Sequence, residues 1–304
     1  MRIKSIAPWF GGKRTMAPMI VEELGPHAAY WEPFCGSMAV LFQKPISGHE
    51  HLSDLYGDVI SLARVVRSEL GPRLFERLTR TLYSEQAFFE IREMWLSGHL
   101  PPVDSTVGWA HLERAYQFFI VSWMGRNGVS GSARANYQMA VRWTPGGGGS
   151  AGRFISAVDS MPAWANRLRH VTILQRDAFE VLEKIEDDPR AAIYIDPPYF
   201  VETRGKGGGS RYEHDFDDAD HRRLAESLSR FEKARVVISY YAHPRLADLY
   251  PLGSWTHRNV FRNKNLHVQN RRGEKPSTAP EVLILNGPSY VRSQTPTLFA
   301  GASA

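Results

Sequence analysis

The chain has 304 residues, of which 43% are hydrophobic and 23% charged, a composition that excludes global disorder. Its formal net charge of +5 permits a polyanionic partner without requiring one. There is no run of about 18 apolar residues and no signal-peptide core, and a single cysteine cannot form an internal disulfide. These features predict a protein of the reducing cytoplasm that neither spans a membrane nor is exported.

The first motif lies at residues 8–13, which read Pro-Trp-Phe-Gly-Gly-Lys and precede an amphipathic helical pattern that ends near Leu24. Its two glycines allow backbone to approach a ligand closely, and Lys13 supplies a positive charge at the start of the predicted helix. The spacing excludes a Walker phosphate-binding loop. Taken alone, the segment is also typical of a plain turn that leads into a helix.

Residues 28–41 predict a strand, a tight turn at Gly36 and a helix that begins at Ser37. A strand that leads through a glycine turn to a helix N-terminus holds nucleotide-like cofactors in Rossmann-type folds. A second strand then ends at Asp54, roughly 20 residues beyond the turn, a spacing at which an acid can bind ribose hydroxyls. The two halves together predict a cofactor site.

Helical patterns replace strand alternation from about residue 60 to residue 160, including segments at 84–96 and 109–124. The second helix leads into a glycine-punctuated loop that carries Arg126 and Asn127. Its aromatic stripe is interpreted as core rather than as a platform for stacked bases: Tyr116, Phe118, Phe119 and Trp123.

Residues 193–200 read Ile-Tyr-Ile-Asp-Pro-Pro-Tyr-Phe and predict a short buried strand with Asp196 at its carboxyl end, where open α/β sheets place ligands. Pro197 and Pro198 remove two backbone donors and stiffen the loop. A carboxylate beside the free carbonyl of Pro197 can accept both hydrogens of a planar amine, and Tyr199 offers a ring face for stacking. The alternative is a proline-capped strand end with an aspartate that caps a helix.

Three further strands are predicted at residues 171–175, 235–240 and 281–286, and Asp177 follows the first of them. With the three earlier strands they make a doubly wound α/β sheet with intervening helices. Histidines and acids crowd residues 214–221, but acids at a helix start favour the helix dipole without any metal. We therefore expect no metal site.

Basic and amide side chains alternate over residues 258–275, and Arg262, Lys264 and Arg271 are candidates to contact DNA phosphates or bases. A solvated surface loop explains the same composition. Residues 288–304 are rich in Pro, Ser, Thr and Ala and predict a flexible tail.

In their order along the chain, these motifs resemble the Dam-like (D12 class) adenine-N6 DNA methyltransferases. The resemblance rests on residues 8–13, 32–39, 52–60, 196–199 and 281–286 and on the helical region between the second and third strands. It implies a Rossmann-like class I methyltransferase sheet formed by residues 1–60 and 161–287. It also implies a mainly helical target-recognition insertion at 61–160, with double-stranded DNA as the partner.

Carried over by position, the resemblance implies that the following residues contact S-adenosylmethionine: Trp9, Lys13, Phe34, Gly36, Asp54, Asp177 and Asp196. It also places Arg126 and Asn127 in a loop that approaches DNA. One departure is Met38, which stands where the family's Phe-x-Gly-x-Gly turn has its second glycine. We expect its side chain to pack behind the turn and leave the close approach to Gly36.

The implied reaction is methyl transfer to N6 of an adenine flipped out of the duplex, with Asp196, Pro197 and Tyr199 as catalytic residues. One alternative is cytosine-N4 methylation, because that amine has the same geometry. Another is a DNA-binding module with a degenerate cofactor pocket, as Met38 would suggest. We expect the protein to be a monomer.

Overall fold

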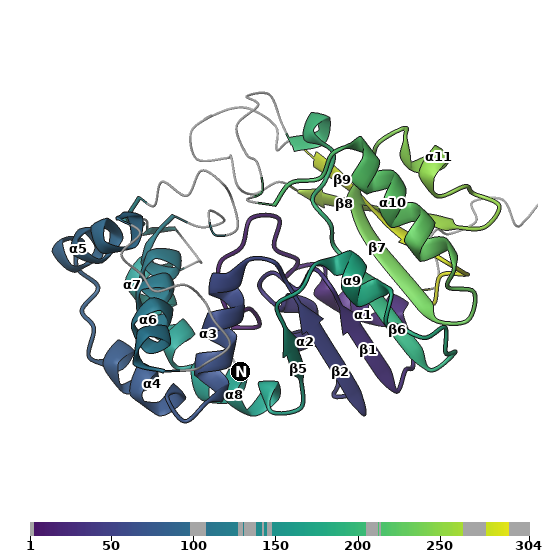
Figure 1. Cartoon of the computed structure of the whole chain (residues 1–304). Coiled ribbons are helices and arrows are strands. Elements are labelled where there is room, and N and C mark those ends of the chain that lie inside the picture. The colour runs from purple at the N-terminus through teal and green to yellow at the C-terminus, as the bar shows by residue number, and fades with distance from the viewer. Residues whose placement is uncertain are drawn as a thin grey trace, which may run out of the picture.

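The computed structural model describes residues 3–97, 108–126, 130, 138–141, 143–144, 148–204, 212, 214–263 and 278–291. Within these residues, the centre of the protein is a seven-stranded sheet with the order β5-β2-β1-β6-β7-β9-β8 (Figure 1). Its strands are β1 (Ala29–Glu32), β2 (His49–Ser53), β5 (Thr172–Leu174), β6 (Ala191–Ile195), β7 (Arg235–Tyr241), β8 (Thr256–Asn263) and β9 (Thr278–Leu285).

Strands β5, β2, β1, β6 and β7 are parallel to one another, whereas β9 runs antiparallel between β7 and β8. The carboxyl ends of the parallel strands therefore meet at one edge of the sheet. Six of these strands were predicted, and β8 was not. This strand covers the first third of the basic stretch at 258–275. It lies at the sheet edge, and burial does not alternate over its described side chains at 256–260.

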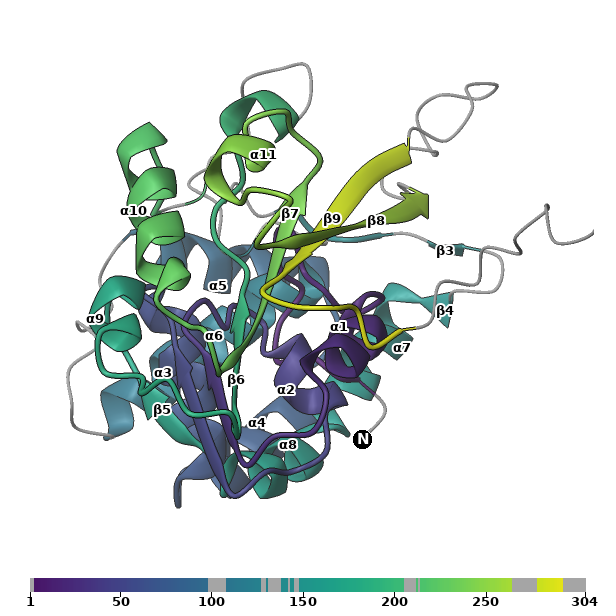
Figure 2. The ribbon, with the colours of Figure 1, turned by 90° about the vertical axis from the view of Figure 1, so that its right-hand side faces the viewer.

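Helices cover both faces of the sheet (Figures 1 and 2). They are α1 (Ala17–Leu24), α2 (Ala39–Gln43), α3 (Gly57–Arg67), α4 (Gly71–Thr79), α5 (Glu85–Leu96), α6 (Trp109–Met124), α7 (Ser150–Val158), α8 (Met161–Leu168), α9 (Ala178–Leu182), α10 (Asp218–Ser229) and α11 (Leu246–Leu249). A short 3-10 helix, η1 (Val201–Arg204), follows β6, and β3 (Trp143–Thr144) pairs with β4 (Gly148–Gly149). One buried cluster joins α9, α10 and α11 to the sheet, and another joins α1, α2 and α3 to its opposite face.

The helical region that was predicted as a separate insertion shares its core with the sheet. The predicted boundary after residue 60 falls inside α3, which packs on α6 and α8. The aromatic stripe of α6 is buried, as predicted, and the indole of Trp123 donates to the carbonyl of Ile6 at 3.1 Å. The sheet and these helices thus share one buried cluster, and the assignment of residues 61–160 to target recognition stays a prediction.

Polar side chains define where several elements begin and end. Asp217 caps α10 by accepting from the backbone of Ala219 and Asp220. Among the described residues, no cluster of three or more His, Cys, Asp or Glu could hold a metal ion. None of the described helices is long and apolar enough to cross a membrane.

The chain after β9 is held to α1 by Glu23, a fully buried acid. Its carboxylate pairs with Arg258 at 2.5 Å and Arg235 at 3.3 Å, and it accepts from the backbone of Tyr290 at 3.0 Å. Contacts to the body of the protein thus extend past residue 288, where the flexible tail was predicted to start. Residues 292–304 lie outside the described part of the chain.

Met38 has a left-handed backbone conformation, with φ 60° and ψ 29°, at the start of α2. Its side chain is fully buried in the core beneath α1 and α2, so it packs behind the glycine turn as expected. A left-handed conformation costs roughly 1–2 kcal/mol for a residue that carries a Cβ.

Because the backbone of Met38 is left-handed, glycine at position 38 should not be less stable than alanine, the reverse of the usual order in a helix. We expect Met38→Ala to lower the free energy of unfolding by about 2–5 kcal/mol, because it empties a buried site. Met38→Gly should be no less stable than Met38→Ala, since glycine relieves the left-handed strain. Urea unfolding measures both variants. At Leu62, buried within regular α3, glycine should instead be less stable than alanine by about 1 kcal/mol.

Candidate active site

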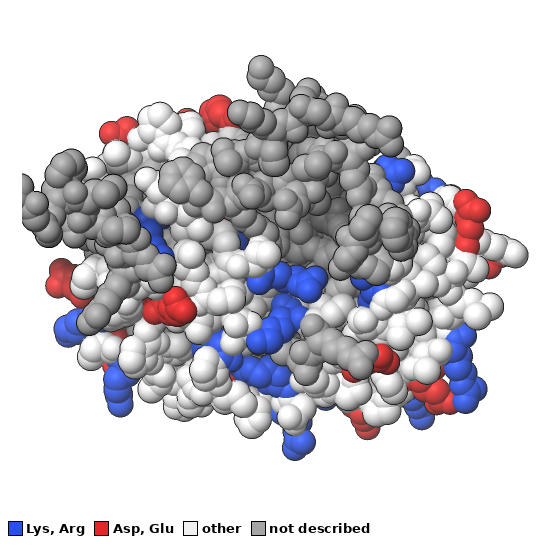
Figure 3. Space-filling view, turned by 180° about the vertical axis from the view of Figure 1, so that it is seen from behind, with Lys and Arg blue, Asp and Glu red and all other residues white. Residues whose placement is uncertain are grey.

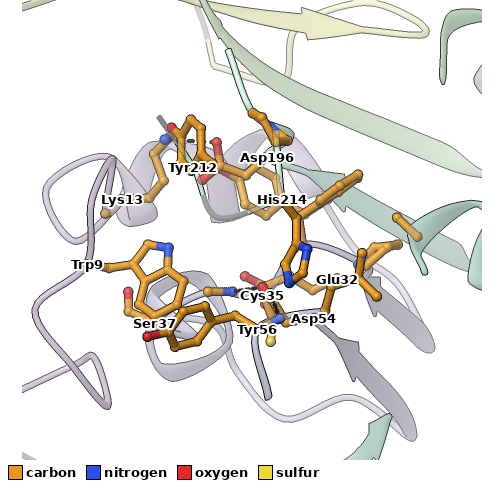
Figure 4. Close-up of a pocket in the computed structure, with 18 of the residues that line it drawn as sticks. Trp9, Lys13, Glu32, Cys35, Ser37, Asp54, Tyr56, Asp196, Tyr212 and His214 are labelled. Carbon is orange, nitrogen blue, oxygen red and sulfur yellow. Dashed lines mark hydrogen bonds and ion pairs between the residues drawn. The ribbon is translucent and has the colours of Figure 1, made fainter. Parts of the chain in front are cut away.

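A cavity opens at the edge of the sheet where the parallel strands end (Figure 4). It holds about 860 Å³ of empty space, counting its mouth toward solvent. Among the residues that line it are all seven predicted to bind the cofactor: Trp9, Lys13, Phe34, Gly36, Asp54, Asp177 and Asp196. Segments far apart in the sequence, at 9–13 and 176–178, thus meet in one site.

Lys13 is buried and forms an ion pair at this cavity with Asp196, whose side chain is 20% exposed; the distance between Nζ and Oδ1 is 2.9 Å. The ammonium also donates to the carbonyl of Gly11 at 2.7 Å and lies 4.8 Å from the centroid of the Tyr199 ring. Burial raises the pKa of the Asp196 carboxyl above its ordinary value, although Lys13 opposes the rise. Burial disfavours the charge of Lys13, but Asp196 and Glu281 hold its pKa above the ordinary value.

Glu281 is a second buried acid near this pair that the sequence reasoning did not identify. It lies on β9 opposite Tyr241 of β7, whose ring is 4.8 Å from that of Tyr199. Its negative charge adds to the rise in the pKa of Asp196 and of Lys13. The available signal was an acid at the start of an otherwise apolar strand, Glu-Val-Leu-Ile-Leu.

The glycine turn is built around the carboxylate of Asp54. Its two oxygens accept from the backbone of Gly36 at 2.7 Å and of Tyr56 at 2.9 Å. Burial raises the pKa of Asp54 to about 6, while these hydrogen bonds and His214 oppose the rise. The acid is thus fixed between β1 and β2 with its oxygens at the cavity.

Gly36 lies directly against Trp9. Its φ is 42°, and a Cβ at this position would be 2.7 Å from the indole Nε1. The Trp9 ring meets Tyr56 edge to face at 5.3 Å between centroids. In the free protein, the backbone of Gly36 therefore lies close to Trp9, which forms an aromatic wall of the cavity.

A second aromatic wall lies on the other side of the cavity. Phe34 and Phe216 meet at 5.7 Å between ring centroids, and Asp177 caps α9 by accepting from Phe179 at 2.8 Å. Glu32 lines the same space, and burial raises its pKa to about 8. Among the lining residues that the sequence reasoning did not identify as site residues are Glu32, Tyr56, Tyr212 and His214.

The remaining predicted residues lie elsewhere. Tyr199 is buried beside Lys13 and, like Pro197, is not among the lining residues of the cavity. Arg126 is exposed at the end of α6, where its backbone donates to Gln138 at 2.7 Å. Arg262 belongs to β8 and pairs with Ala279. Three others lie outside the described residues: Asn127, Lys264 and Arg271.

A family model described as D12 class N6 adenine-specific DNA methyltransferase matches residues 9–267, which is most of the chain. The chain belongs to this family. The D12-class assignment made from the motifs is thus confirmed, and so is the α/β methyltransferase fold. The protein is a site-specific DNA methyltransferase that acts on adenine N6.

One curated relative is the Type II methyltransferase M.MjaIII of Methanocaldococcus jannaschii. It is 26% identical over 262 residues, which cover 79% of this chain and 84% of the relative. Two solved structures are also similar, with low TM-scores. They are a precorrin 8w decarboxylase from Methanobacterium thermoautotrophicum (14% identity, 90% and 89% of the two chains, TM-score 0.32) and the rRNA methyltransferase AviRa from Streptomyces viridochromogenes (13% identity, 90% and 83%, TM-score 0.34).

The family decides between the alternatives that the sequence left open. Membership in an adenine-N6 class disfavours cytosine-N4 methylation. The degenerate-pocket alternative rested on Met38, and this side chain is buried in the core away from the cavity lining.

The buried acids of this D12-class site predict how methylation depends on pH. Activity should fall as the pH drops through the raised pKa of Asp196, because protonation removes its carboxylate. Glu281→Gln removes a charge that raises this pKa, so the acid limb of the profile should shift to lower pH. Single-turnover methylation rates at saturating DNA would measure the shift.

A matched control for this measurement is Glu76→Gln, which changes an exposed acid of α4 that pairs with Arg80. Its profile should coincide with that of the unmodified protein. An acid limb that stays in place in Glu281→Gln would contradict the electrostatic influence of Glu281 on Asp196.

Proposed function

We propose that the cavity binds S-adenosylmethionine beside an adenine turned out of double-stranded DNA. The observation that carries this proposal is the convergence of all seven predicted cofactor residues on one cavity, with Asp196 among them. A fixed carboxylate on a glycine turn and two aromatic walls suit a nucleoside that carries hydroxyls and a flat base. The residues present therefore fit this cofactor.

Each part of the cofactor has a candidate partner. Asp54 would accept from the ribose hydroxyls, and Asp177 would lie near the adenine ring, beside the contact between Phe34 and Phe216. When bound, S-adenosylmethionine supplies a methyl group on a positively charged sulfur. The acids that surround the cavity favour such a cation, because negative charge in a water-poor site attracts it strongly.

Asp196 and Pro197 would hold the target amine. The carboxylate and the proline carbonyl would accept the two N–H bonds of adenine N6, so that its lone pair is directed at the methyl group. Positive charge would grow on N6 as it takes up the methyl group, and Asp196 would stabilise that charge more than the neutral ground state. The carboxylate of Asp196 would accept the surplus proton of N6 and pass it to solvent.

Tyr199 would stack on the extruded base and offset part of the few kcal/mol that flipping costs. In the free protein Lys13 lies over this ring and pairs with Asp196. The incoming amine must therefore displace the ammonium of Lys13 from both contacts.

DNA contact is supported by basic side chains on the surface. Lys and Arg gather in the middle of the face opposite the view of Figure 1 (Figure 3). Burial and the neighbouring positive charge of Arg14 lower the pKa of Arg153 on α7. The two guanidinium groups are therefore close together. Neighbouring positive charges of this kind favour binding to the phosphates of DNA. We assign target recognition to residues 61–160 with Arg126 and Asn127, and infer a cytoplasmic monomer.

The central test is nucleoside mass spectrometry of plasmid DNA from methylation-deficient cells that express the chain. We expect N6-methyladenine with the unmodified protein and about a hundredfold less with Asp196→Ala, because loss of one such electrostatic partner costs on the order of 3 kcal/mol. Equal N6-methyladenine from the two proteins would refute the role of Asp196. N4-methylcytosine would refute the adenine assignment.

The place of the cofactor is tested at Gly36. Gly36→Ala puts a methyl group 2.7 Å from the Trp9 indole, in a left-handed conformation, and should weaken S-adenosylmethionine binding by about tenfold or more. Calorimetric titration measures the affinity. Gly253→Ala is a matched control, because nothing lies within 4 Å of a Cβ there, and it should bind normally. Unchanged affinity in Gly36→Ala would argue against cofactor binding at this turn.

A further inference from the structure

Arg204 is the last residue of η1, in the segment that follows the carboxyl end of β6, and its side chain is only 5% exposed. The guanidinium donates to the carbonyl of Tyr199 in the Asp-Pro-Pro-Tyr loop. It also forms two parallel hydrogen bonds to Asp215, at 2.6 and 2.7 Å. One buried side chain thus joins the loop that follows β6 to the segment that precedes α10.

The segment at Asp215 forms part of the cavity lining. We call Tyr212, His214 and Phe216 the pocket wall, since all three line the cavity. Figure 4 shows the first two. The guanidinium of Arg204 lies 4.8 Å from the centroid of the Tyr212 ring, and Asp215 accepts from the backbone of Phe216 at 3.0 Å. Arg204 and Asp215 therefore contact or flank each part of this wall.

The pocket wall also reaches the other segments of the site. The Tyr212 ring meets Phe10 at 5.0 Å, and the Phe216 ring meets Phe34 at 5.7 Å. His214 is close enough to Asp54 to lower the pKa of that acid, against the larger effect of burial. A molecule held between Trp9, Asp54 and Phe34 would thus be enclosed by the wall that Arg204 holds.

We propose that Arg204 is a positioning residue that clamps the pocket wall to the Asp-Pro-Pro-Tyr loop and so slows the escape of bound S-adenosylmethionine. The inference rests on the cofactor site proposed above. A planar guanidinium is needed at this position. Its N–H groups can donate two parallel hydrogen bonds to a carboxylate and a further one to the Tyr199 carbonyl. A lysine in its place keeps the charge and loses this geometry.

The test is the dissociation rate of S-adenosylmethionine from the full chain, followed by stopped-flow chase with excess competitor. We expect dissociation about tenfold faster in Arg204→Ala and in Asp215→Asn, since each loses a charge-assisted contact. Arg204→Lys should also be faster. The double variant Arg204→Ala/Asp215→Asn should be no faster than either single variant, because both changes break the same clamp.

Arg190 and Asp188 offer a matched control pair. They are also joined by two side-chain hydrogen bonds, at 3.1 and 2.7 Å, but they precede β6 at the opposite end of the strand and are more exposed. Arg190→Ala and Asp188→Asn should leave the dissociation rate unchanged. Thermal unfolding of each variant without cofactor separates a loss of overall stability from a change in the rate.

The outcomes are distinct. Normal cofactor binding with unchanged dissociation rates in Arg204→Ala and Asp215→Asn would overturn this inference alone. Equal acceleration in the control pair would also overturn it, because the effect would not belong to the pocket wall. Failure of the unmodified chain to bind S-adenosylmethionine would overturn the proposed function and this inference with it.

Discussion

The ion pair between Lys13 and Asp196 closes the N-terminal segment onto the carboxyl end of β6, and the site depends on it. Removing two charges from water costs several kcal/mol per ion, and a buried pair seldom adds net stability. Here the ammonium of Lys13 also donates to the carbonyl of Gly11, lies over the ring of Tyr199 and is stabilised by the negative charge of Glu281. Such an arrangement is better explained by chemistry than by stability, because it keeps a carboxylate ionised in a water-poor place.

The topology of the sheet accounts for the concentration of acids around that pair. Glu32, Asp54 and Asp196 end or follow β1, β2 and β6, which are neighbours in the sheet, so their carboxyl groups meet at one edge. Burial raises the pKa of all three, and the charge of Asp196 adds to the rise in the other two. A negative, partly desolvated cavity is unfavourable when empty and is relieved by a cation, as the sulfonium of the proposed cofactor would be.

The sequence predicted those parts of the site that are local. Gly36, Asp54 and Asp196 each follow the end of a strand, next to residues typical of turns. Short sequence motifs are enough to predict such positions. Glu281 and Tyr212 were not predicted as part of the candidate site, because their places depend on which strand lies beside β7 and on how the chain returns before α10. The edge strand β8 was missed for a related reason. It has one neighbour, and its described side chains, at 256–260, show no alternation between core and solvent.

Met38 shows how a family pattern can change without loss of the site. Its left-handed backbone costs roughly 1–2 kcal/mol, whereas full burial of a methionine side chain contributes roughly 1.5–3 kcal/mol. The two terms nearly cancel, so a glycine is not required at this position on grounds of stability. Gly36 differs, because a Cβ there would collide with Trp9. The first glycine of the turn is therefore constrained by the cavity and the second only by the backbone, which is why the second can be replaced.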